Sequence, residues 1–168
     1  MPPSPPLADQ LAAQLLAAGR RLATAESCTG GWLAKTLTDL PGSSRWFECG
    51  YVTYSNAAKV RDLGVSERTL ERHGAVSEAT ALEMAAGALQ RAGADVAISI
   101  TGVAGPDGGT AEKPVGTVWF GVATRDGRPA EARVQRFQGD RESIRSQSVK
   151  YALEWLVAIQ VLQNGTTV

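Results

Sequence analysis

The sequence predicts a single α/β domain, a three-layer α/β/α sandwich with a mixed sheet. Helix-like segments alternate with short strand-like segments through the first half of the 168-residue chain. The segment 95–103 is an apolar run, which is typical of a strand covered on both faces. Two further strand-like segments flank the turn signal Asp126-Gly127 and suit an antiparallel pair, which makes the expected sheet mixed.

Glycine and proline mark the element boundaries near the amino terminus. Leucines at helical spacing predict a first helix that ends at Gly19. The pair Gly30-Gly31 opens a second helix, and Pro41-Gly42 stops it. β-branched and aromatic residues then indicate a strand. The expected elements are a helix over 7–19, a strand over 22–26, a helix over 32–40 and a strand over 46–54.

Capping residues delimit the remaining helices. Ser55 caps the first of them, and Ser66 begins the next, which Gly74 ends. Ser77 begins the longest middle helix, and Asp140 caps the last helix of the chain. The expected elements are helices over 57–63, 66–73 and 77–91, strands over 95–103, 115–124 and 131–137, and a helix over 141–161.

Composition narrows the classes of function. Lys plus Arg and Asp plus Glu both number 17, so the net charge is zero and neither nucleic acid nor a membrane surface is an expected partner. The apolar runs are shorter than the ~18 residues that span a bilayer. We expect residues 1–6 to be a disordered lead-in, 7–163 to be one domain and 164–168 to be a tail.

The cysteine and histidine content favours a cytoplasmic protein without a metal. Cys28 and Cys49 are too few for a secreted disulfide scaffold, and no signal peptide is recognisable. One histidine and two isolated cysteines do not make a standard zinc site. Five large apolar residues suit either a subunit interface or the core: Trp46, Phe47, Trp155, Leu156 and Ile159.

The segment Thr24-Ala-Glu-Ser-Cys-Thr-Gly-Gly31 places Ser27 between a strand end and a helix start. N–H groups in the first turn of a helix lack partners within the helix, so they can hold an anion or an oxyanion. We predict Ser27 as a nucleophile, and Thr29, Gly30 and Gly31 as substrate-binding residues. Taken alone, the segment also fits a plain serine cap.

A lysine is the best candidate to activate Ser27. The single histidine, His73, lies at a predicted helix end and is a poor base for this serine. A lysine can act as a base when burial or a neighbouring charge lowers its pKa. A predicted strand delivers Tyr54 and Lys59 follows it, so we predict a Ser–Lys pair assisted by Tyr54. The alternative is that Tyr54 packs in the core and Lys59 is solvated.

A glycine-rich loop follows the apolar strand. Ligand sites of open α/β sheets lie at strand ends of this kind. The loop matches neither G-x-G-x-x-G nor the Walker pattern, which argues against dinucleotide and nucleoside triphosphate binding. We predict substrate contacts by Thr101, Gly102, Ala104 and Gly105, and the alternative is a mobile surface loop.

Arg141 and Arg145 lie four residues apart at the start of the last predicted helix. This spacing puts both guanidinium groups on one face, near the positive end of the helix dipole. Arginine suits bidentate contacts to phosphate, so the pair predicts a phosphorylated substrate. The alternative is a solvated face on which Glu142 pairs with the arginines.

Together these segments resemble the C-terminal domain of the competence/damage-inducible CinA proteins, in its stand-alone form. The matching stretches occur in family order and span nearly the whole domain, so the set is far more specific than any one of them. They are TAESCTGG (24–31), GYVTYSNAAK (50–59), HGAVSE (73–78), ISITGVAGPDGGTAEKPVGTVWFGVA (98–123) and FQGDRESIR (137–145).

The resemblance implies a nicotinamide-nucleotide amidohydrolase, which converts nicotinamide mononucleotide to nicotinate mononucleotide and ammonia in pyridine nucleotide salvage. It maps the catalytic pair onto Ser27 and Lys59, with Tyr54 in support. Neither a metal nor a cofactor is expected. The expected partners are the substrate and further copies of the chain, as a homo-oligomer.

Three other functions fit parts of the pattern. A sensor would bind a pyridine nucleotide without turnover, but it would need no nucleophile and base such as Ser27 and Lys59. An amidase of the same mechanism would act on another small amide. An interaction domain for DNA uptake or damage response would be expected to carry a basic surface, which the neutral composition does not favour.

Overall fold

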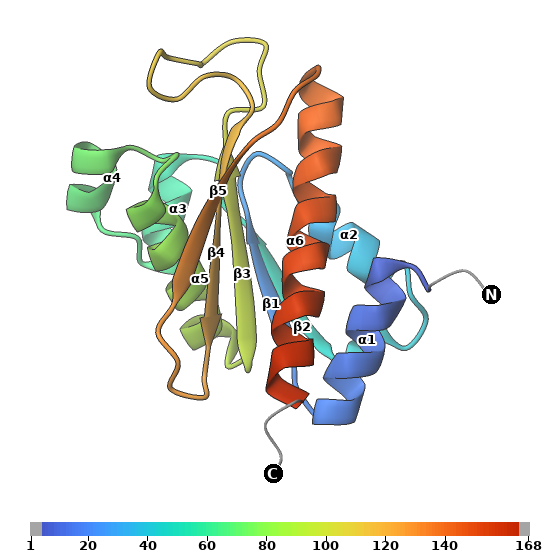
Figure 1. The fold of residues 1–168 in the computed structure, drawn as a ribbon. Coiled ribbons are helices and arrows are strands. Elements are labelled where there is room, and N and C mark those ends of the chain that lie inside the picture. Colours follow the sequence, from blue (N-terminus) through green and yellow to red (C-terminus); the bar gives the residue numbers. More distant parts are fainter. Residues whose placement is uncertain (1–4, 165–168) are drawn as a thin grey trace.

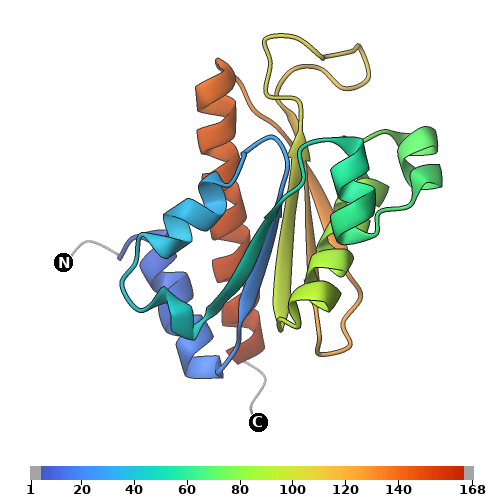
Figure 2. The ribbon, with the colours of Figure 1, turned by 180° about the vertical axis from the view of Figure 1, so that it is seen from behind.

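The computed structural model describes the backbone of residues 5–164 and the side chains of residues 5–159. A five-stranded sheet lies between two layers of helices, which confirms the predicted α/β/α sandwich (Figures 1 and 2). Residues 1–4 of the predicted lead-in and 165–168 of the predicted tail lie outside the described residues. The strands are β1 (Leu22–Glu26), β2 (Phe47–Val52), β3 (Val96–Gly102), β4 (Thr117–Thr124) and β5 (Glu131–Arg136).

The sheet has the order β2-β1-β3-β4-β5 and is mixed, as predicted. β1 pairs in parallel with β2 and with β3, whereas β4 is antiparallel to both β3 and β5. All five residues of β1 and the first six of β3 are buried, as expected for strands covered on both faces. The edge strands β2 and β5 alternate or expose their side chains.

One face of the sheet is covered by α1 (Leu7–Ala18), α2 (Trp32–Thr38) and α6 (Arg141–Asn164). The core beneath these helices contains the five large apolar residues for which the sequence allows either a subunit interface or the core. Trp46, Trp155 and Leu156 are fully buried there, and Phe47 and Ile159 pack against them half-buried. These five side chains therefore belong to the core of the protomer.

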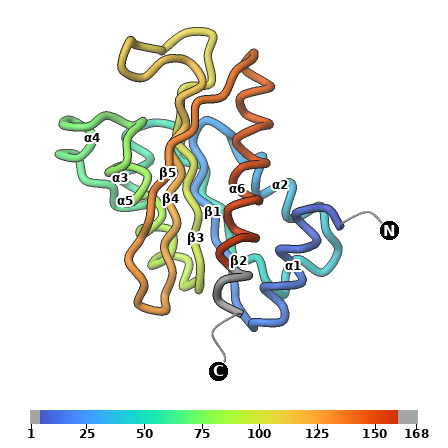
Figure 3. Tube along the Cα trace, in the orientation of Figure 1, coloured from blue at the N-terminus to red at the C-terminus, as the bar shows by residue number. Residues whose placement is uncertain are grey.

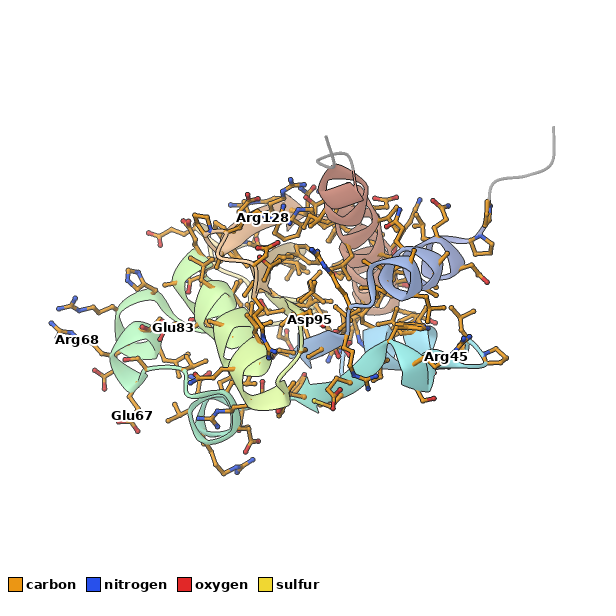
Figure 4. The ribbon with its side chains drawn as sticks, turned by 90° about the horizontal axis from the view of Figure 1, so that it is seen from below. Arg45, Glu67, Arg68, Glu83, Asp95 and Arg128 are labelled. Atoms are coloured by element: carbon orange, nitrogen blue, oxygen red, sulfur yellow. The ribbon has the colours of Figure 1, made fainter. Side chains whose placement is uncertain are left out.

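The other face is covered by α3 (Asn56–Leu63), α4 (Glu67–His73) and α5 (Glu78–Ala92). α4 lies farthest out, and its Glu67 and Arg68 point away from the sheet (Figure 4). α5 approaches the end of α3 so closely that a Cβ atom built on Gly87 would lie 1.9 Å from the carbonyl oxygen of Leu63. No helix within residues 5–164 is long and apolar enough to cross a membrane.

Three of the four predicted caps are confirmed. The side chain of Ser55 accepts a hydrogen bond from the N–H of Ala58 at 3.0 Å, and Ser77 accepts one from the N–H of Thr80 at 3.2 Å. The Oδ1 atom of Asp140 accepts from the N–H of residue 143 at 2.8 Å. The side chain of residue 66 makes no capping bond, although α4 begins where it was expected.

The second strand is shorter than predicted. A 3₁₀ turn, Ser43–Arg45, precedes it, and Tyr54 lies beyond its last residue. The chain leaves β1 toward α2 on one face of the sheet and leaves β2 toward α3 on the other. The two connections diverge at the carboxyl ends of the strands, where ligands of open α/β sheets bind. Figures 1 and 3 show the loop 103–116 extending past the same end.

The opposite end of the sheet is closed by local contacts. Figure 4 looks onto this end, where Asp95 stands just before β3. Its carboxylate accepts a hydrogen bond from the N–H of Arg21 at 2.8 Å, and the Arg21 side chain pairs with Glu48. These contacts hold the starts of β1, β2 and β3 together, so the open end of the sheet is the one at which these three strands finish.

Candidate active site

Ser27 and Lys59 meet at the divergence between β1 and β2. Ser27 directly follows the last residue of β1, and Lys59 lies within α3. The Nζ atom of Lys59 lies 2.9 Å from the Oγ atom of Ser27. Ser27 is 8% exposed and Lys59 is 1% exposed, so the alternative of a solvated lysine is wrong. Two side chains 32 residues apart in sequence thus form one buried pair.

The surroundings of Lys59 prepare it to act as a base. Its Nζ atom also lies 2.8 Å from the carbonyl oxygen of Thr53 and 3.0 Å from that of Tyr54. Burial lowers the pKa of Lys59 from 10.5 to about 8, because a charged amine loses hydration there. A neutral amine has two N–H groups, which the two carbonyls can accept, and its lone pair is then free for the Ser27 hydroxyl proton.

Backbone bonds to both neighbouring strands fix the position of Ser27. Its N–H donates to the carbonyl of Ile100 on β3 at 2.9 Å. The carbonyl of Glu26 accepts from the N–H of Thr53, just beyond β2, at 2.9 Å. Since Thr53 also contacts Lys59, the same strand pairing holds both members of the pair in register.

Glu26 is a site residue that the sequence did not reveal. It is fully buried at the end of β1, and its carboxylate accepts three hydrogen bonds. The donors are the Thr29 hydroxyl at 2.7 Å, the Leu33 N–H at 2.8 Å and the Ala34 N–H at 3.1 Å. The expectation that the start of α2 is free to hold an anion is therefore wrong for these two amides, because Glu26 already occupies them.

The turn between Ser27 and α2 keeps a smaller set of free donors. Gly30 and Gly31 have φ angles of 62° and 99°, which favour glycine. The Gly30 N–H donates to the Ser27 carbonyl at 3.0 Å, so it is already engaged. Within residues 5–164, the N–H groups of Cys28, Thr29 and Gly31 have no acceptor in another residue. These three N–H groups are the candidates to stabilise an oxyanion.

Cys28 stands beside the nucleophile but is poorly suited to replace it. Its side chain is buried, and burial raises the pKa of its thiol from 9.0 to about 11. The thiolate is the reactive form of cysteine, so a thiol with this pKa is a weak nucleophile at neutral pH. The hydroxyl of Ser27, with Lys59 against it, is the better-prepared group.

Arg145 lies against the outer side of the turn. Its Nε atom donates to the Cys28 carbonyl at 3.1 Å and its Nη2 atom to the Thr29 carbonyl at 3.3 Å. Its guanidinium lies 5.5 Å from the centre of the Trp32 ring. A pocket of about 510 Å³ opens here, within the range of small-molecule sites. It is lined by Thr29, Gly30, Gly31, Trp32, Lys35 and Arg145.

Arg141 reaches a different segment. Its Nη1 atom donates to the Gly105 carbonyl at 2.7 Å, and its Nη2 atom to the Tyr54 hydroxyl at 3.1 Å. Tyr54 is 61% exposed, so the alternative that it packs in the core is wrong, and the amine of Lys59 contacts its carbonyl but not its phenol. Among the side chains of residues 5–159, Glu142 forms no ion pair with either arginine.

The strand end before the glycine-rich loop is tightly packed. The Thr101 hydroxyl is buried and donates to the Ala75 carbonyl at 2.8 Å. Ala104 is buried in the core, and a Cβ atom on Gly102 would lie 2.7 Å from the side chain of Val118. Substrate contacts by Thr101, Gly102 and Ala104 stay predictions. Because their side chains are buried or absent, such contacts would be made by their backbone groups. Within residues 5–159, no group of three His, Cys, Asp or Glu side chains could hold a metal ion.

Two bacterial relatives are similar to the chain over almost its whole length. The nicotinamide-nucleotide amidohydrolase PncC of Escherichia coli (strain K12) is 56% identical over 158 residues, 94% of each chain. The protein of the same name from Enterobacter agglomerans is 59% identical over 148 residues, 88% of this chain and 90% of that one. A CinA-like protein of Mycobacterium tuberculosis is 56% identical over 148 residues, which make up 34% of its length.

Solved structures and a family model agree with this likeness. A CinA superfamily protein from Klebsiella pneumoniae superposes with a TM-score of 0.88 at 44% identity, over 92% of this chain and 96% of that one. The competence/damage inducible protein CihA of Agrobacterium tumefaciens gives 0.85 at 44% identity, over 95% and 99%. The model of the CinA C-terminal domain matches residues 5–159. The chain therefore belongs to the CinA C-terminal domain family.

Proposed function

We propose that this protein hydrolyses the carboxamide of nicotinamide mononucleotide to nicotinate mononucleotide and ammonia, with Ser27 as nucleophile and Lys59 as base. The observation that carries the proposal is the buried 2.9 Å contact between Lys59 Nζ and Ser27 Oγ. The substrate is supported by the near full-length likeness to amidohydrolases of nicotinamide nucleotide.

Acylation begins with neutral Lys59, which accepts the Ser27 hydroxyl proton directly. The Ser27 oxygen then forms a bond to the amide carbon of the substrate, and the amide oxygen becomes an oxyanion. The free N–H groups of the turn, those of Cys28, Thr29 and Gly31, can stabilise that charge, and one such donor contributes about 2.7–4 kcal/mol in enzymes of this kind. The phenol of Tyr54 takes no part in the proton transfer, since the Ser27–Lys59 contact is already direct.

The protonated Lys59 then donates its proton to the departing nitrogen, so that ammonia leaves and Ser27 carries the nicotinoyl ester. Water attacks this ester with Lys59 again as base, and nicotinate mononucleotide is released with Ser27 restored. The chain's own side chains and backbone dipoles supply every group in these steps.

The 5′-phosphate of the substrate binds in the pocket beside Arg145. Lys35 adds a second positive charge to that pocket, and Trp32 supplies an aromatic wall. Two N–H groups of Arg145 hold the turn, and the remaining ones can contact phosphate. Arg141 ties Gly105 to the far side of the site, so the glycine-rich loop forms the opposite border.

Ammonia release tests the proposal. Wild type should release ammonia from nicotinamide mononucleotide, and Ser27→Ala should not; a Ser27→Ala protein with the wild-type rate would refute the mechanism. Intact mass after rapid quenching should show a nicotinoyl mononucleotide adduct on Ser27. Equal turnover of the mononucleotide, the riboside and free nicotinamide would argue against a phosphate pocket and for an amidase of wider range.

Location, domain extent and assembly follow from the same proposal. We expect one catalytic domain over residues 7–163, in the cytoplasm, where its nucleotide substrate is found. We also expect a homo-oligomer, and size-exclusion chromatography with light scattering measures it. A monomeric mass at assay concentration would show that one copy suffices for activity.

A further inference from the structure

Glu26 is a buried acid without a cationic partner. It is 0% exposed, and none of the ion pairs among the side chains of residues 5–159 includes it. A buried carboxylate is costly unless hydrogen bonds compensate for the lost hydration. Here the compensation comes from the Thr29 hydroxyl and from the N–H groups of Leu33 and Ala34. Buried charges are often replaceable by apolar groups without loss of stability, so the position of this one beside Ser27 calls for another reason.

The three donors to Glu26 all lie beyond Ser27 in the chain. Glu26 directly precedes the nucleophile, and its carboxylate binds the turn and helix that directly follow it. The chain from Glu26 to Ala34 therefore closes on itself around Ser27. The beginning of this segment is held to the chain beside β2 and to β3 by the backbone bonds of Glu26 and Ser27.

The enclosed turn has little else to fix it from within. Gly30 and Gly31 have no side chains, and the turn's only other internal main-chain bonds run from Gly30 to Ser27 and from Trp32 to Thr29. Arg145 contacts the turn from outside, through carbonyl oxygens. The Glu26 carboxylate is thus the internal group that sets how the free N–H groups of the turn face the reacting carbonyl.

We propose that Glu26 is a positioning residue for acyl transfer: by binding Thr29 and the first turn of α2, it fixes the turn that carries Ser27 and the oxyanion donors. This inference rests on the proposed amide hydrolysis at Ser27. It also assigns the N–H groups of Leu33 and Ala34 to an internal anion, so the substrate's phosphate must be held by other groups of the neighbouring pocket, such as the Arg145 guanidinium.

The test compares wild type with Glu26→Gln, using Glu48→Gln as the matched control. Glutamine keeps the size of Glu26 but places an NH₂ group against donors. We expect kcat for nicotinamide mononucleotide to fall about 10²-fold, as for the loss of one oxyanion donor. We expect KM to change less than about threefold, because ground-state binding is kept. Glu48 pairs with Arg21 at the far end of the sheet, and its variant should match wild type.

Each rate is divided by the fraction of Ser27 that a fluorophosphonate labels at completion, which counts folded sites. A Glu26→Gln protein that melts at a lower temperature but keeps wild-type kcat per labelled site would overturn the proposal, since only stability would then depend on Glu26. If this variant does not fold, Thr29→Val removes one donor and should lower kcat, and Thr29→Ser should retain more activity than valine. Equal kcat for these two Thr29 variants would also overturn it.

The labelling rate separates this inference from the proposed function. If wild type does not hydrolyse nicotinamide mononucleotide, the assigned reaction fails, yet fluorophosphonate labelling still reports how Ser27 and its oxyanion donors are placed. Slower labelling of Ser27 in Glu26→Gln than in Glu48→Gln supports the positioning role. An equal labelling rate contradicts it.

Discussion

The two borders of the site differ in how they are held. On the border formed by β1 and β2, Ser27 and Lys59 are buried, and backbone carbonyls and N–H groups fix both of them. On the border formed by α6 and the glycine-rich loop, Arg141 joins Gly105 to Tyr54, which is largely exposed. The first border, the inner one, is rigid and desolvated, and the second, the outer one, is open to water.

The difference separates chemistry from recognition. A proton transfer needs a lysine whose pKa is lowered by burial, and only the inner border provides this. A soluble nucleotide must enter and leave, and an exposed border with adaptable polar contacts allows this. We therefore expect substitutions on the inner border to reduce kcat and substitutions on the outer border mainly to change KM.

The largest effect is expected for Lys59→Met, which keeps the length of the side chain and removes the base. General-base catalysis contributes up to about 10⁴-fold, so kcat should fall at least about 10³-fold with KM little changed. Steady-state ammonia release measures it. Lys150→Met, on the exposed side of α6, is the control that should match wild type. A Lys59→Met protein whose kcat lies within about tenfold of the wild-type value would show that another group acts as the base.

The pH dependence should show the lowered pKa of Lys59. Below about 8 the amine is protonated and cannot accept the Ser27 proton, so kcat/KM should rise with pH and level off above about 8. Between pH 6 and 9 the neutral fraction of a group with this pKa grows about 10²-fold. A profile that is flat over this range, or one that falls toward pH 9, would assign the base to a different group.

Arg145→Ala should raise KM for nicotinamide mononucleotide by about 10- to 100-fold, the range for a lost charge-assisted hydrogen bond. Turnover of the riboside, which has no phosphate, should change much less. Arg141→Ala provides the comparison across the site and should affect the two substrates alike. Equal losses on both substrates in Arg145→Ala would move the phosphate away from this pocket.

The smallest effect is expected for Tyr54→Phe. Among the described side chains the phenol bonds only to the charged guanidinium of Arg141, and because Tyr54 is open to water this bond should contribute about 1.5 kcal/mol, the low end for a bond to a charged group. The expected change in kcat/KM is therefore no more than about tenfold. A loss of about 10³-fold would place the phenol in the proton path. The contrast between inner and outer borders would then break down.

Local signals in the sequence predicted most elements of the fold. Gly19 ends α1 in the left-handed conformation, and Ser55, Ser77 and Asp140 cap their helices by bonds to residues three positions on. Such signals act within a few residues, so they can be read from the chain directly. The mixed sheet followed from one apolar strand and one turn signal.

The sequence favours a pairing of Ser27 with Lys59, but it cannot place the two side chains in contact. That contact depends on β1 lying beside β2, and strand order is a property of the whole sheet. The alternative that Tyr54 packs in the core is wrong because β2 ends at Val52, so Tyr54 lies beyond the strand, where the alternation of its two faces no longer decides burial.

Glu26 was missed for a different reason. A helix start after a serine predicts a site for an external anion, and this local pattern does not indicate that the strand before it supplies an anion of its own. A glutamate in a strand whose other residues are all apolar or small is a signal in retrospect, because such a position is buried and must be compensated.

The close approach of α5 to α3 at Gly87 gives the active site a dependence on a residue that never touches it. Lys59 stands one turn before Leu63, whose carbonyl would lie 1.9 Å from any Cβ atom at position 87. Even a methyl group there would force α3 and α5 apart, and any shift of α3 would carry the lysine with it. The reach of the base toward the serine is thus set by the neighbouring helix of the same layer, through the absence of a side chain.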